Sequence, residues 1–486
     1  MQRVALALAL AVGIAPTFGA ERALFAEPKR YVAPRSFDAQ PPALKLAHGD
    51  AVPTTRVVLA PPTADERKPL DAYNAAPFER SAQIGFARAV AFDPAALRWV
   101  ALPGGGQAAR FSVTSPRAAA LRLGLAIERM DDGVELRFFG SSDPSRVYGP
   151  ITARQIRLSE PVWWSPVIEG DTLTAEIFLA KGTSAQAFRF ALRQISHLVA
   201  TVADTVRPKL TPDPCVPDVA CLVNPPAGLI DATKAVAKMV FTRDGDTRSC
   251  TGTLLADTEP SSARPYFYTA AHCIREQSQA SSLNTYWFYE ALTCGSTDAP
   301  NTVQLTGGAQ LLRIDDQLDA SLLLLAEPPP DGAVFAGWDA SYVPAGTVIA
   351  GIHHPLGSLK KVSQGTAQGY DTIDPGLAPP TYIVAKWSSG ATYQGSSGSG
   401  LFTPSDGAWY LRGGLRGGAS FCTASRPRGL DYYSRLDYFY PSVQQYLDPA
   451  SATAIPALSR EALAATALLI VAFGVACLRR RTGRWR

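Results

Sequence analysis

Three residues in the middle of the chain have types and an order along the sequence that could perform nucleophilic catalysis. His272 lies between small residues and a cysteine in the segment 269–273 (TAAHC), and Ser397 lies in a glycine-framed run at 395–400 (GSSGSG). Asp319 stands between them, immediately before the apolar run 320–325 (ASLLLL). A serine, a base and a carboxylate together activate a hydroxyl for acyl transfer. The sequence therefore predicts a serine hydrolase site formed by these three side chains.

The glycine-framed run has the composition that a nucleophilic serine requires. The turn must expose the serine oxygen and direct neighbouring backbone N–H groups toward the same point. Gly395 and Gly398 allow backbone angles and a close substrate approach that a side chain would prevent. We therefore expect the N–H groups of Gly395 and Ser397 to form an oxyanion hole. The run could instead be a flexible linker, which would make these motifs coincidental in a β-sandwich protein.

Among the five histidines, His272 is the best candidate for the base. His48 falls in a segment without hydrophobic periodicity, and His197 falls in an earlier β-rich segment. The pair His353 and His354 precedes a proline in a strand–turn context, where a structural role is favoured over a metal site.

Asp319 is the best candidate for the carboxylate that orients the base. It leads directly into a predicted buried strand, and its place between base and nucleophile is the chain order of chymotrypsin-type enzymes. Asp315 and Asp316 are the alternatives, but neither leads into the apolar run. Such a mechanism requires no metal and no organic cofactor.

The elements that must position these residues are predicted to be strands. Residues 81–205 contain short alternating runs separated by glycine- and aspartate-containing turns, which predicts an antiparallel β-sandwich. A proline-rich stretch at 204–226 marks a boundary, and strands dominate again up to about residue 450. Residues 21–80 show no sustained periodicity and are predicted to be a linker or a loosely ordered prosegment. We therefore expect an all-β protein with two folded units.

Both ends of the chain have the composition of targeting signals. Residues 1–20 predict a secretory signal peptide. The uncharged apolar run 462–478 predicts a short transmembrane helix with the following arginines in the cytoplasm, a buried terminal helix being the alternative. With the segment 455–459 (IPALS), the tail 455–486 resembles the IPTL-type sorting signals of Gram-negative bacteria. This resemblance implies targeting to the cell envelope and removal of the tail.

Charge and cysteine content narrow the function classes. The net charge of +4 is accounted for by arginines at the very end of the chain, so no basic face for nucleic acid is expected. Six of the seven cysteines lie between 215 and 422, and Cys477 lies in the tail. Six cysteines in an exported domain predict three disulfides, with several pairings open. A zinc site is the weaker alternative, because the chain has no CxxC pair.

Several segments of residues 210–450 in combination resemble the bacterial lysyl endopeptidases, a branch of the trypsin-like serine proteases. The similar segments, besides Cys215 and Cys221, are 269–273 (TAAHC), 336–339 (AGWD), 351–355 (GIHHP), 395–400 (GSSGSG) and 446–451 (YLDPAS). The resemblance implies a chymotrypsin-like double β-barrel in residues 210–450, with protein or peptide substrates. It also implies the disulfides Cys215–Cys422, Cys221–Cys294 and Cys250–Cys273.

The resemblance further implies cleavage after lysine. The family places an aspartate nine residues after the last cysteine of the domain, which is Asp431 in this chain. An aspartate at a pocket floor pairs with a cationic side chain, and the geometry selects ammonium or guanidinium. Position 391, where a trypsin-like pocket often has its acid, is Ala391. Asp431 could instead pair with Arg428 or Arg435, and a broader specificity for arginine and lysine is the alternative.

The chain departs from the family at two places near the predicted site. Arg416 stands where the family tends to have a histidine, and with Gly417 and Gly418 it is predicted to contact substrate. No tryptophan occurs at 370–381, where the family tends to place one near the catalytic histidine, and Tyr370 is the candidate replacement. We expect these differences to affect rate and pH optimum rather than the triad.

A maturation site is predicted at Lys209–Leu210. The family's mature chain begins five residues before the first cysteine, so a lysine-specific enzyme could cut its own prosegment there. In trypsin, activation forms a new N-terminus that pairs with an aspartate directly before the nucleophile. Ser396 occupies that position in this chain, so this activation route is excluded. The preceding domain is therefore predicted to be an inhibitor or folding aid whose displacement activates the enzyme. The alternative to an enzyme is a binding protein anchored at the cell surface, with a vestigial protease fold.

Overall fold

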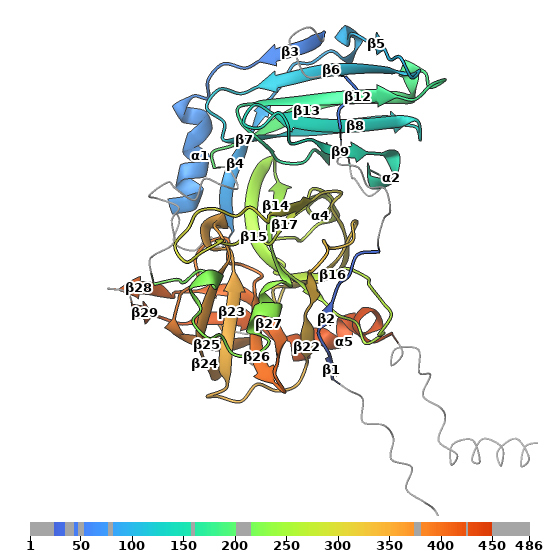
Figure 1. The fold of residues 1–486 in the computed structure, drawn as a ribbon. Coiled ribbons are helices and arrows are strands. Elements are labelled where there is room, and N and C mark those ends of the chain that lie inside the picture. The colour runs from blue at the N-terminus through green and yellow to red at the C-terminus, as the bar shows by residue number, and fades with distance from the viewer. Residues whose placement is uncertain are drawn as a thin grey trace, which may run out of the picture.

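The structure is a computed structural model that describes residues 24–34, 43–46, 53–75, 81–156, 161–200, 215–373, 381–423 and 426–449. The predicted signal peptide, the predicted tail and the Lys209–Leu210 bond lie outside these residues. Two β-rich units follow one another along the chain and stack in space (Figure 1), an N-terminal domain up to residue 200 and a second domain from residue 215. None of the helices in the described residues is long and apolar enough to span a membrane.

The N-terminal domain is a sandwich of two sheets. One sheet has the order β3-β6-β12-β8-β9, with β5 beside β6, and the other has β10 and β11 beside β7, then β13 and β4. Their bounds are β3 (Thr54–Val58), β4 (Ala82–Ala89), β5 (Val100–Ala101), β6 (Gln107–Thr114), β7 (Ala120–Met130), β8 (Val134–Gly140), β9 (Tyr148–Ile151), β10 (Trp163–Trp164), β11 (Ile168–Glu169), β12 (Thr172–Leu179) and β13 (Phe188–Leu198). Alternating residues such as Phe111, Leu123, Phe138 and Ile177 fill the space between the sheets, which is the packing that period-two strands predict.

The predicted linker 21–80 is wrong in part, because its described residues form regular structure. Residues 54–58 add β3 to the sandwich, paired in parallel with β6, so this sheet is not purely antiparallel. Residues 64–75 form helix α1 (Ala64–Ala75), which packs against β4. Residues 25–26 and 29–30 form β1 (Phe25–Ala26) and β2 (Lys29–Arg30) on the second domain. These strands are too short for sequence periodicity to reveal them.

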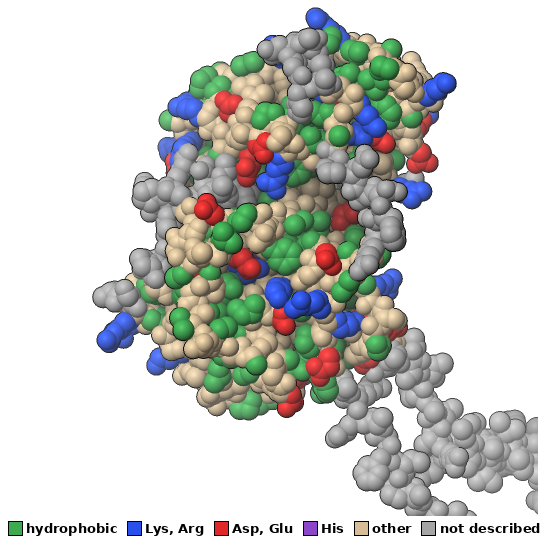
Figure 2. Space-filling model, viewed as in Figure 1, with side chains coloured by type: hydrophobic (Ala, Val, Ile, Leu, Met, Phe, Trp, Pro, Cys, Tyr) green, Lys and Arg blue, Asp and Glu red, His purple; other side chains and the backbone are tan. Residues whose placement is uncertain are grey.

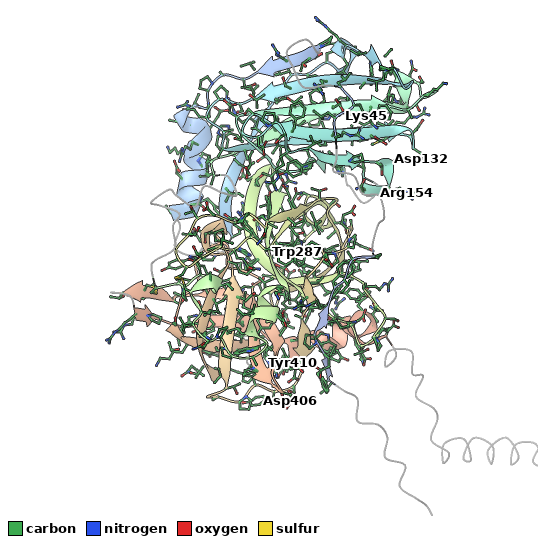
Figure 3. The ribbon with its side chains drawn as sticks, viewed as in Figure 1. Lys45, Asp132, Arg154, Trp287, Asp406 and Tyr410 are labelled. Atoms are coloured by element: carbon green, nitrogen blue, oxygen red, sulfur yellow. A yellow bond between two sulfur atoms is a disulfide. The ribbon has the colours of Figure 1, made fainter. Side chains whose placement is uncertain are left out.

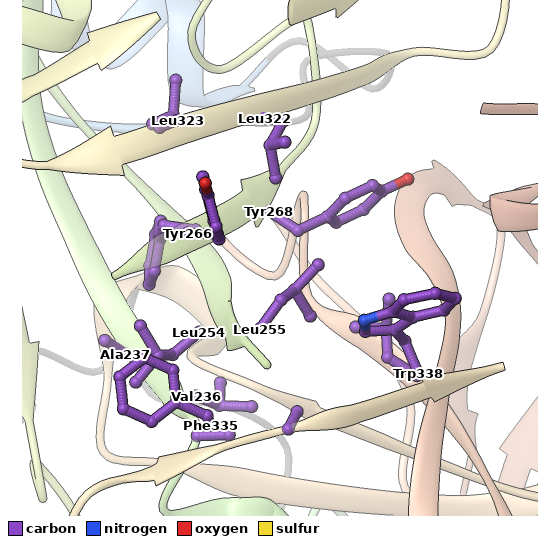
Figure 4. Packing of buried hydrophobic residues seen from close by; sticks show 14 of the residues in the cluster. Val236, Ala237, Leu254, Leu255, Tyr266, Tyr268, Leu322, Leu323, Phe335 and Trp338 are labelled. Carbon is purple, nitrogen blue, oxygen red and sulfur yellow. The ribbon is translucent and has the colours of Figure 1, made fainter. Parts of the chain in front are cut away.

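The first half of the second domain is an open half-barrel. Its strand order is β17-β14-β15-β16-β20-β19, with β18 beside β17. The bounds are β14 (Val236–Arg243), β15 (Asp246–Leu255), β16 (Tyr266–Thr269), β17 (Asn284–Trp287), β18 (Val303–Leu305), β19 (Ala309–Asp315) and β20 (Ala320–Leu325). Its core includes Leu254, Tyr268, Leu322 and Leu323. Figure 4 shows Leu322 pointing toward Tyr268 and Leu323 on the opposite face of the same strand, while Trp287 lies near the middle of the molecule (Figure 3).

The second half of this domain is a closed six-stranded barrel. The order β27-β26-β23-β24-β25-β30 returns to β27, since β27 also pairs with β30. The bounds are β23 (Val348–His353), β24 (Lys361–Asp371), β25 (Tyr382–Ser389), β26 (Gly400–Ser405), β27 (Ala408–Gly418) and β30 (Asp431–Ser434). The fold is thus the chymotrypsin-like pair of barrels that the sequence predicted, all-β and preceded by a β-sandwich.

Shorter elements complete the second domain. These are α3 (Leu229–Thr233), α4 (Gln277–Ser281), β21 (Val334–Phe335), β22 (Gly337–Asp339), β28 (Phe421–Thr423), β29 (Arg426–Arg428) and α5 (Leu436–Leu447), while α2 (Ala153–Ile156) belongs to the N-terminal domain. The helix α5 buries Leu436, Phe439 and Val443 against the core. Three disulfides join Cys215 to Cys422, Cys221 to Cys294 and Cys250 to Cys273, the pairing that the family resemblance implied.

The two domains share one continuous sheet. Strand β4 of the sandwich pairs antiparallel with β15 of the half-barrel, with Ala82 opposite Ser249 and Gln83 opposite Arg248. An apolar cluster that includes Ile84 of the sandwich and Val240 of the half-barrel lies behind this pairing. On the face that Figure 2 shows, basic and acidic side chains are interspersed rather than gathered in one basic field.

Candidate active site

The register of two strands brings His272 and Asp319 together. Strands β16 and β20 are antiparallel, with Thr269 opposite Ser321, so the chain leaving β16 and the chain entering β20 meet at one end of the half-barrel. His272 Nδ1 lies 2.7 Å from Asp319 Oδ2, and the backbone N–H of His272 donates to Asp319 Oδ1 at 2.8 Å. These two hydrogen bonds fix the plane of the imidazole and give it the tautomer in which Nδ1 carries the proton.

Asp319 is buried and adopts a left-handed backbone conformation. Its φ is +55°, which costs about 1 kcal/mol for a residue with a side chain, although aspartate tolerates it better than most. Only 3% of the side chain is exposed. Burial acts to raise the pKa of Asp319, but the charge and hydrogen bonds of His272, with a contribution from Arg416, hold it below its ordinary value. Asp319 is thus suited to remain an anion beside the imidazole.

Ser397 lies at the centre of a tight turn whose glycines are required by their surroundings. Gly395 and Gly398 have φ of +85° and +79°. A Cβ on Gly398 would lie 2.2 Å from Thr269 Oγ1 and 2.5 Å from the carbonyl oxygen of Thr251, so no side chain fits there. The close approach places this turn against β15 and against the end of β16, the strand that precedes His272.

Two contacts place Ser397 beside the histidine. The N–H of Thr251 donates to the carbonyl of Ser397 at 2.9 Å, and Sγ of Cys273 lies 3.8 Å from the same oxygen. His272 Nε2 makes no hydrogen bond within the described residues, and 17% of the side chain is exposed. The three predicted catalytic residues therefore gather at the junction of the two barrels.

His353 and His354 support the nucleophile turn from behind. His353 Nδ1 lies 2.8 Å from Oγ of Ser396, and its Nε2 lies 3.0 Å from Oγ of Ser363. Burial lowers the pKa of His353 to about 3, and it lowers the pKa of His354 well below its ordinary value. Neutral, buried imidazoles of this kind fit the structural role that the sequence favoured.

The described residues contain one cluster with the composition of a metal site, formed by Cys250, His272 and Cys273. Its two sulfurs are joined to each other in a disulfide. A disulfide sulfur carries no negative charge to offer a metal ion, so these residues do not fit a zinc site.

A cavity of about 710 Å³ is lined by Ser397 and by residues of the closed barrel. Arg416, Gly417 and Gly418 from the end of β27 form one wall of this cavity. Its other lining residues include Thr392, Tyr393, Gln394, Leu415, Ser420 and Tyr432. A hollow of this size that opens beside a nucleophile can accept one long side chain.

Asp431 lies behind this wall as a fully buried carboxylate. Its Oδ2 accepts hydrogen bonds from Trp387 Nε1 at 2.6 Å, Thr392 Oγ1 at 2.9 Å and Ser420 Oγ at 2.7 Å. Among the described residues, its Oδ1 accepts a hydrogen bond only from the N–H of Ser420, at 3.3 Å. Burial raises the pKa of Asp431, while the hydrogen bonds from Trp387, Ser420 and Thr392 oppose that rise.

The alternative in which Asp431 pairs with a nearby arginine is not what the structure shows. Arg435 binds Asp437 and stacks on the rings of Tyr370 and Tyr438. None of the ion pairs within the described residues involves Asp431, and its hydrogen-bond partners are all neutral. The cavity therefore has a buried negative charge beside it that is not neutralised by the described part of the chain.

Arg416 lies between the cavity and the triad. Its Nη1 is 3.9 Å from Asp319 Oδ2, and its guanidinium lies over the ring of Tyr382 at 5.1 Å from the centroid. Tyr382 is in turn held by its hydroxyl, which donates to the carbonyl of Gln317. A permanent cation thus borders the pair formed by His272 and Asp319, the predicted base and its carboxylate.

Sequence reasoning missed several residues of this site. Tyr370, the candidate replacement for the family's tryptophan, accepts a hydrogen bond from the N–H of Val343 and packs against the tilted ring of Tyr342. The aromatic ring under Arg416 is that of Tyr382, which the sequence did not indicate. The donors to Asp431 were not identified either, because each comes from a different segment. The sequence carried no signal for Asn74 and Ala75, which reach the cavity from the end of α1 in the other domain.

Comparisons with known proteins show which family this chain resembles. The family model "Lysyl endopeptidase, C-terminal domain" matches residues 211–434, and the "Lysyl endopeptidase N-terminal domain" matches residues 58–199. A lysyl endopeptidase of Pseudomonas aeruginosa is 36% identical over 374 residues, which span 74% of this chain and 79% of that protein.

Likenesses to solved structures are more remote. The HtrA-type protease AlgW with tripeptide has a TM-score of 0.32 at 18% identity, and the match covers 46% of this chain and 63% of that one. The Rv3671c protease in its inactive form has a TM-score of 0.31 at 17% identity, covering 47% of this chain and 96% of that one.

Proposed function

Because the chain belongs to the lysyl endopeptidase family of serine proteases, we propose that it is exported and hydrolyses peptide bonds on the carboxyl side of lysine. The observation that carries this proposal is the position of Asp431. This fully buried carboxylate has only neutral partners among the described residues. It lies behind Thr392 and Ser420, which line the same cavity as Ser397. A cationic side chain that enters the cavity would supply the missing countercharge.

In the proposed mechanism, Ser397 Oγ attacks the carbonyl carbon that follows lysine. His272 Nε2 accepts the serine proton and returns it to the leaving amine, while Asp319 holds the imidazole through Nδ1. The backbone N–H groups of Gly395 and Ser397 stabilise the oxyanion of the tetrahedral intermediate. Water then attacks the acyl-enzyme with the same assistance from His272.

Lysine selection follows from the donors around Asp431. Three of them occupy Oδ2, which leaves acceptor capacity on Oδ1 for an ammonium group. Gly418 lies against this oxygen, since a Cβ there would be 2.3 Å from Oδ1. A compact ammonium needs one such point of contact, whereas a guanidinium needs a planar bidentate partner. Specificity for both arginine and lysine is the alternative that the experiment below separates.

The N-terminal domain is proposed to inhibit the enzyme until it is displaced. Helix α1 ends at the cavity, where Gln394 Nε2 donates to the carbonyl of Asn74 at 3.3 Å. The guanidinium of Arg248 on β15 lies 4.2 Å from the centre of the Tyr73 ring. These contacts narrow the approach to Ser397 for a polypeptide substrate.

Maturation by cleavage after Lys209, performed by the enzyme on itself, is part of the same proposal. The bond lies in the segment 201–214, which joins the two domains. Export is supported by the predicted signal peptide and by three disulfides, which form in oxidising compartments.

Cleavage mapping tests the proposal. The purified chain is incubated with a denatured protein, beside a Ser397→Ala control, and the new termini are identified by mass spectrometry. We expect cuts only after lysine, absent from the control. Cuts after arginine as well would keep the mechanism and overturn the role given to Asp431. A chain that cuts nothing and does not react with a fluorophosphonate would instead favour a binding protein with an inactive protease fold.

A further inference from the structure

The first described residues of the chain bind the far side of the protease domain. We call residues 24–33 the N-terminal strap. Strand β1 pairs antiparallel with β22, with Ala26 opposite Trp338, and β2 pairs with β21. The N–H of Ala340 donates to the carbonyl of Leu24 at 2.8 Å. Figure 1 shows β1 and β2 beside β22, at the opposite end of the molecule from the strands of the sandwich.

Side chains of the strap occupy formed sites on the protease domain. Lys29 Nζ lies 3.1 Å from Oδ1 of Asp257, whose side chain is 3% exposed, and it also donates to the carbonyls of Glu259 and Ser262. The hydroxyl of Tyr410, labelled in Figure 3, donates to Glu27 Oε2 at 2.7 Å. An ammonium with three acceptors, one of them a buried carboxylate, is a specific contact rather than a surface ion pair.

The protease domain is shaped to receive the strap at Gly337. A Cβ on this glycine would lie 2.7 Å from the carbonyl oxygen of Ala26 and 2.8 and 2.9 Å from atoms of Pro28. These are the three nearest atoms, and all belong to the strap. A side chain at position 337 would therefore displace the strap before it disturbed the protease domain itself.

A second and separate contact joins the sandwich to the half-barrel. Besides the β4–β15 pairing, Arg122 of β7 is fully buried and donates through Nη2 to the carbonyl of Ser282 at 2.7 Å. Its guanidinium also lies over the ring of Trp164, 5.5 Å from the centroid. Strand pairing together with a buried arginine is typical of a specific interface.

We propose that the protease domain binds its own prosegment bivalently, through the strap and through the β4 face, and keeps it after the connection at 201–214 is cut. The inference extends the proposed maturation, in which that connection is cleaved. Neither contact includes residues 201–214, so cleavage there leaves both intact. The strap is thus the partner of the edge of β22. Lys29 of the strap holds it there by binding Asp257.

Bivalent binding predicts slow release. When one contact opens, the other keeps the free segment at an effective concentration on the order of millimolar, so it rebinds before the prosegment escapes. Loss of one of the two contacts lowers overall avidity by about 10²-fold or more. Displacement of the strap is therefore the step that frees the mature enzyme.

The test uses the full chain with Ser397→Ala and a recognition sequence for an unrelated protease inserted within 201–209. After complete cutting, the complex is diluted and release of the N-terminal fragment is followed by size-exclusion chromatography. The variant Gly337→Ala is compared with the control Gly104→Ala, whose added Cβ would meet no atom within 4 Å. Because the nucleophile is absent and the cut is external, the outcome does not depend on lysine specificity or on self-cleavage.

We expect the parent and Gly104→Ala to retain the fragment and Gly337→Ala to release it about 100-fold faster. Equal release from both variants, or immediate release from the parent, would overturn the proposal. If Gly337→Ala does not fold, deletion of residues 24–33 replaces it with the same expected acceleration. If the fragment is still released at the parental rate after that deletion, the proposal is equally overturned.

Discussion

The guanidinium of Arg416 lies 3.9 Å from the carboxylate of Asp319 and is supported from the other side by the ring of Tyr382. Asp319 therefore has two neighbours that can carry positive charge, Arg416 and the imidazole of His272. Arg416 also forms part of the cavity wall beside Ser397. One side chain thus borders both the catalytic pair and the cavity proposed to receive substrate.

We expect Arg416→Gln to shift the acidic limb of the pH profile of kcat/KM to higher pH by about one unit or less. Arg416 helps to hold the pKa of Asp319 below its ordinary value, so its removal favours the protonated carboxyl, which no longer supports the imidazole. Arg416→Lys keeps the charge and should retain the parental profile. Profiles that coincide for all three enzymes would show that Arg416 acts only as a wall of the cavity.

Asp431→Asn should reduce kcat/KM for lysine substrates by about 10²- to 10³-fold, because the ammonium would lose its buried countercharge. The kcat/KM for a substrate with an uncharged residue before the cleaved bond should fall much less. The exposed Asp406→Asn serves as the control. Peptides that differ only at this residue provide the measurement, and an equal loss on charged and uncharged peptides would point to a structural defect instead.

Gly398→Ala should abolish activity and lower the free energy of unfolding by roughly 2–4 kcal/mol. The substitution combines the cost of a left-handed backbone with a clash at Thr269 Oγ1. Gly407 has the same φ of +79°, and a Cβ there would meet no atom within 4 Å, so Gly407→Ala should cost about 1 kcal/mol and remain active. Urea unfolding with an activity assay separates the two, and equal losses would assign the whole effect to the backbone.

Lys238 makes stability depend on pH. Burial lowers the pKa of Lys238 to about 7, whereas an unfolded lysine titrates near ~10.4. Between these values the unfolded chain binds more protons, so the free energy of unfolding should rise with pH by at most about 1.4 kcal/mol per unit.

Lys238→Met should remove this rise and stabilise the chain at pH 7, as measured by urea unfolding in the Ser397→Ala background. The exposed Lys386→Met is the control and should leave the pH dependence unchanged. A pH dependence that persists in Lys238→Met would mean that another group titrates in this range.

The sequence by itself determined the local chemistry of this protein. Small residues before His272, glycines around Ser397 and an apolar run after Asp319 are local requirements of a triad, and they are legible without a structure. Strand periodicity likewise indicated the sandwich and the protease domain. Short strands such as β1 and β2 carry no such periodicity, so their residues were assigned to a linker.

Tertiary structure alone decided which distant segments meet. Trp387, Thr392 and Ser420 converge on Asp431 from separate elements, and Asn74 reaches the cavity from another domain. The strap reaches β22 across more than half of the chain. Such contacts depend on strand register and on the shape of the packed barrels, which arise from many weak interactions rather than from any local pattern.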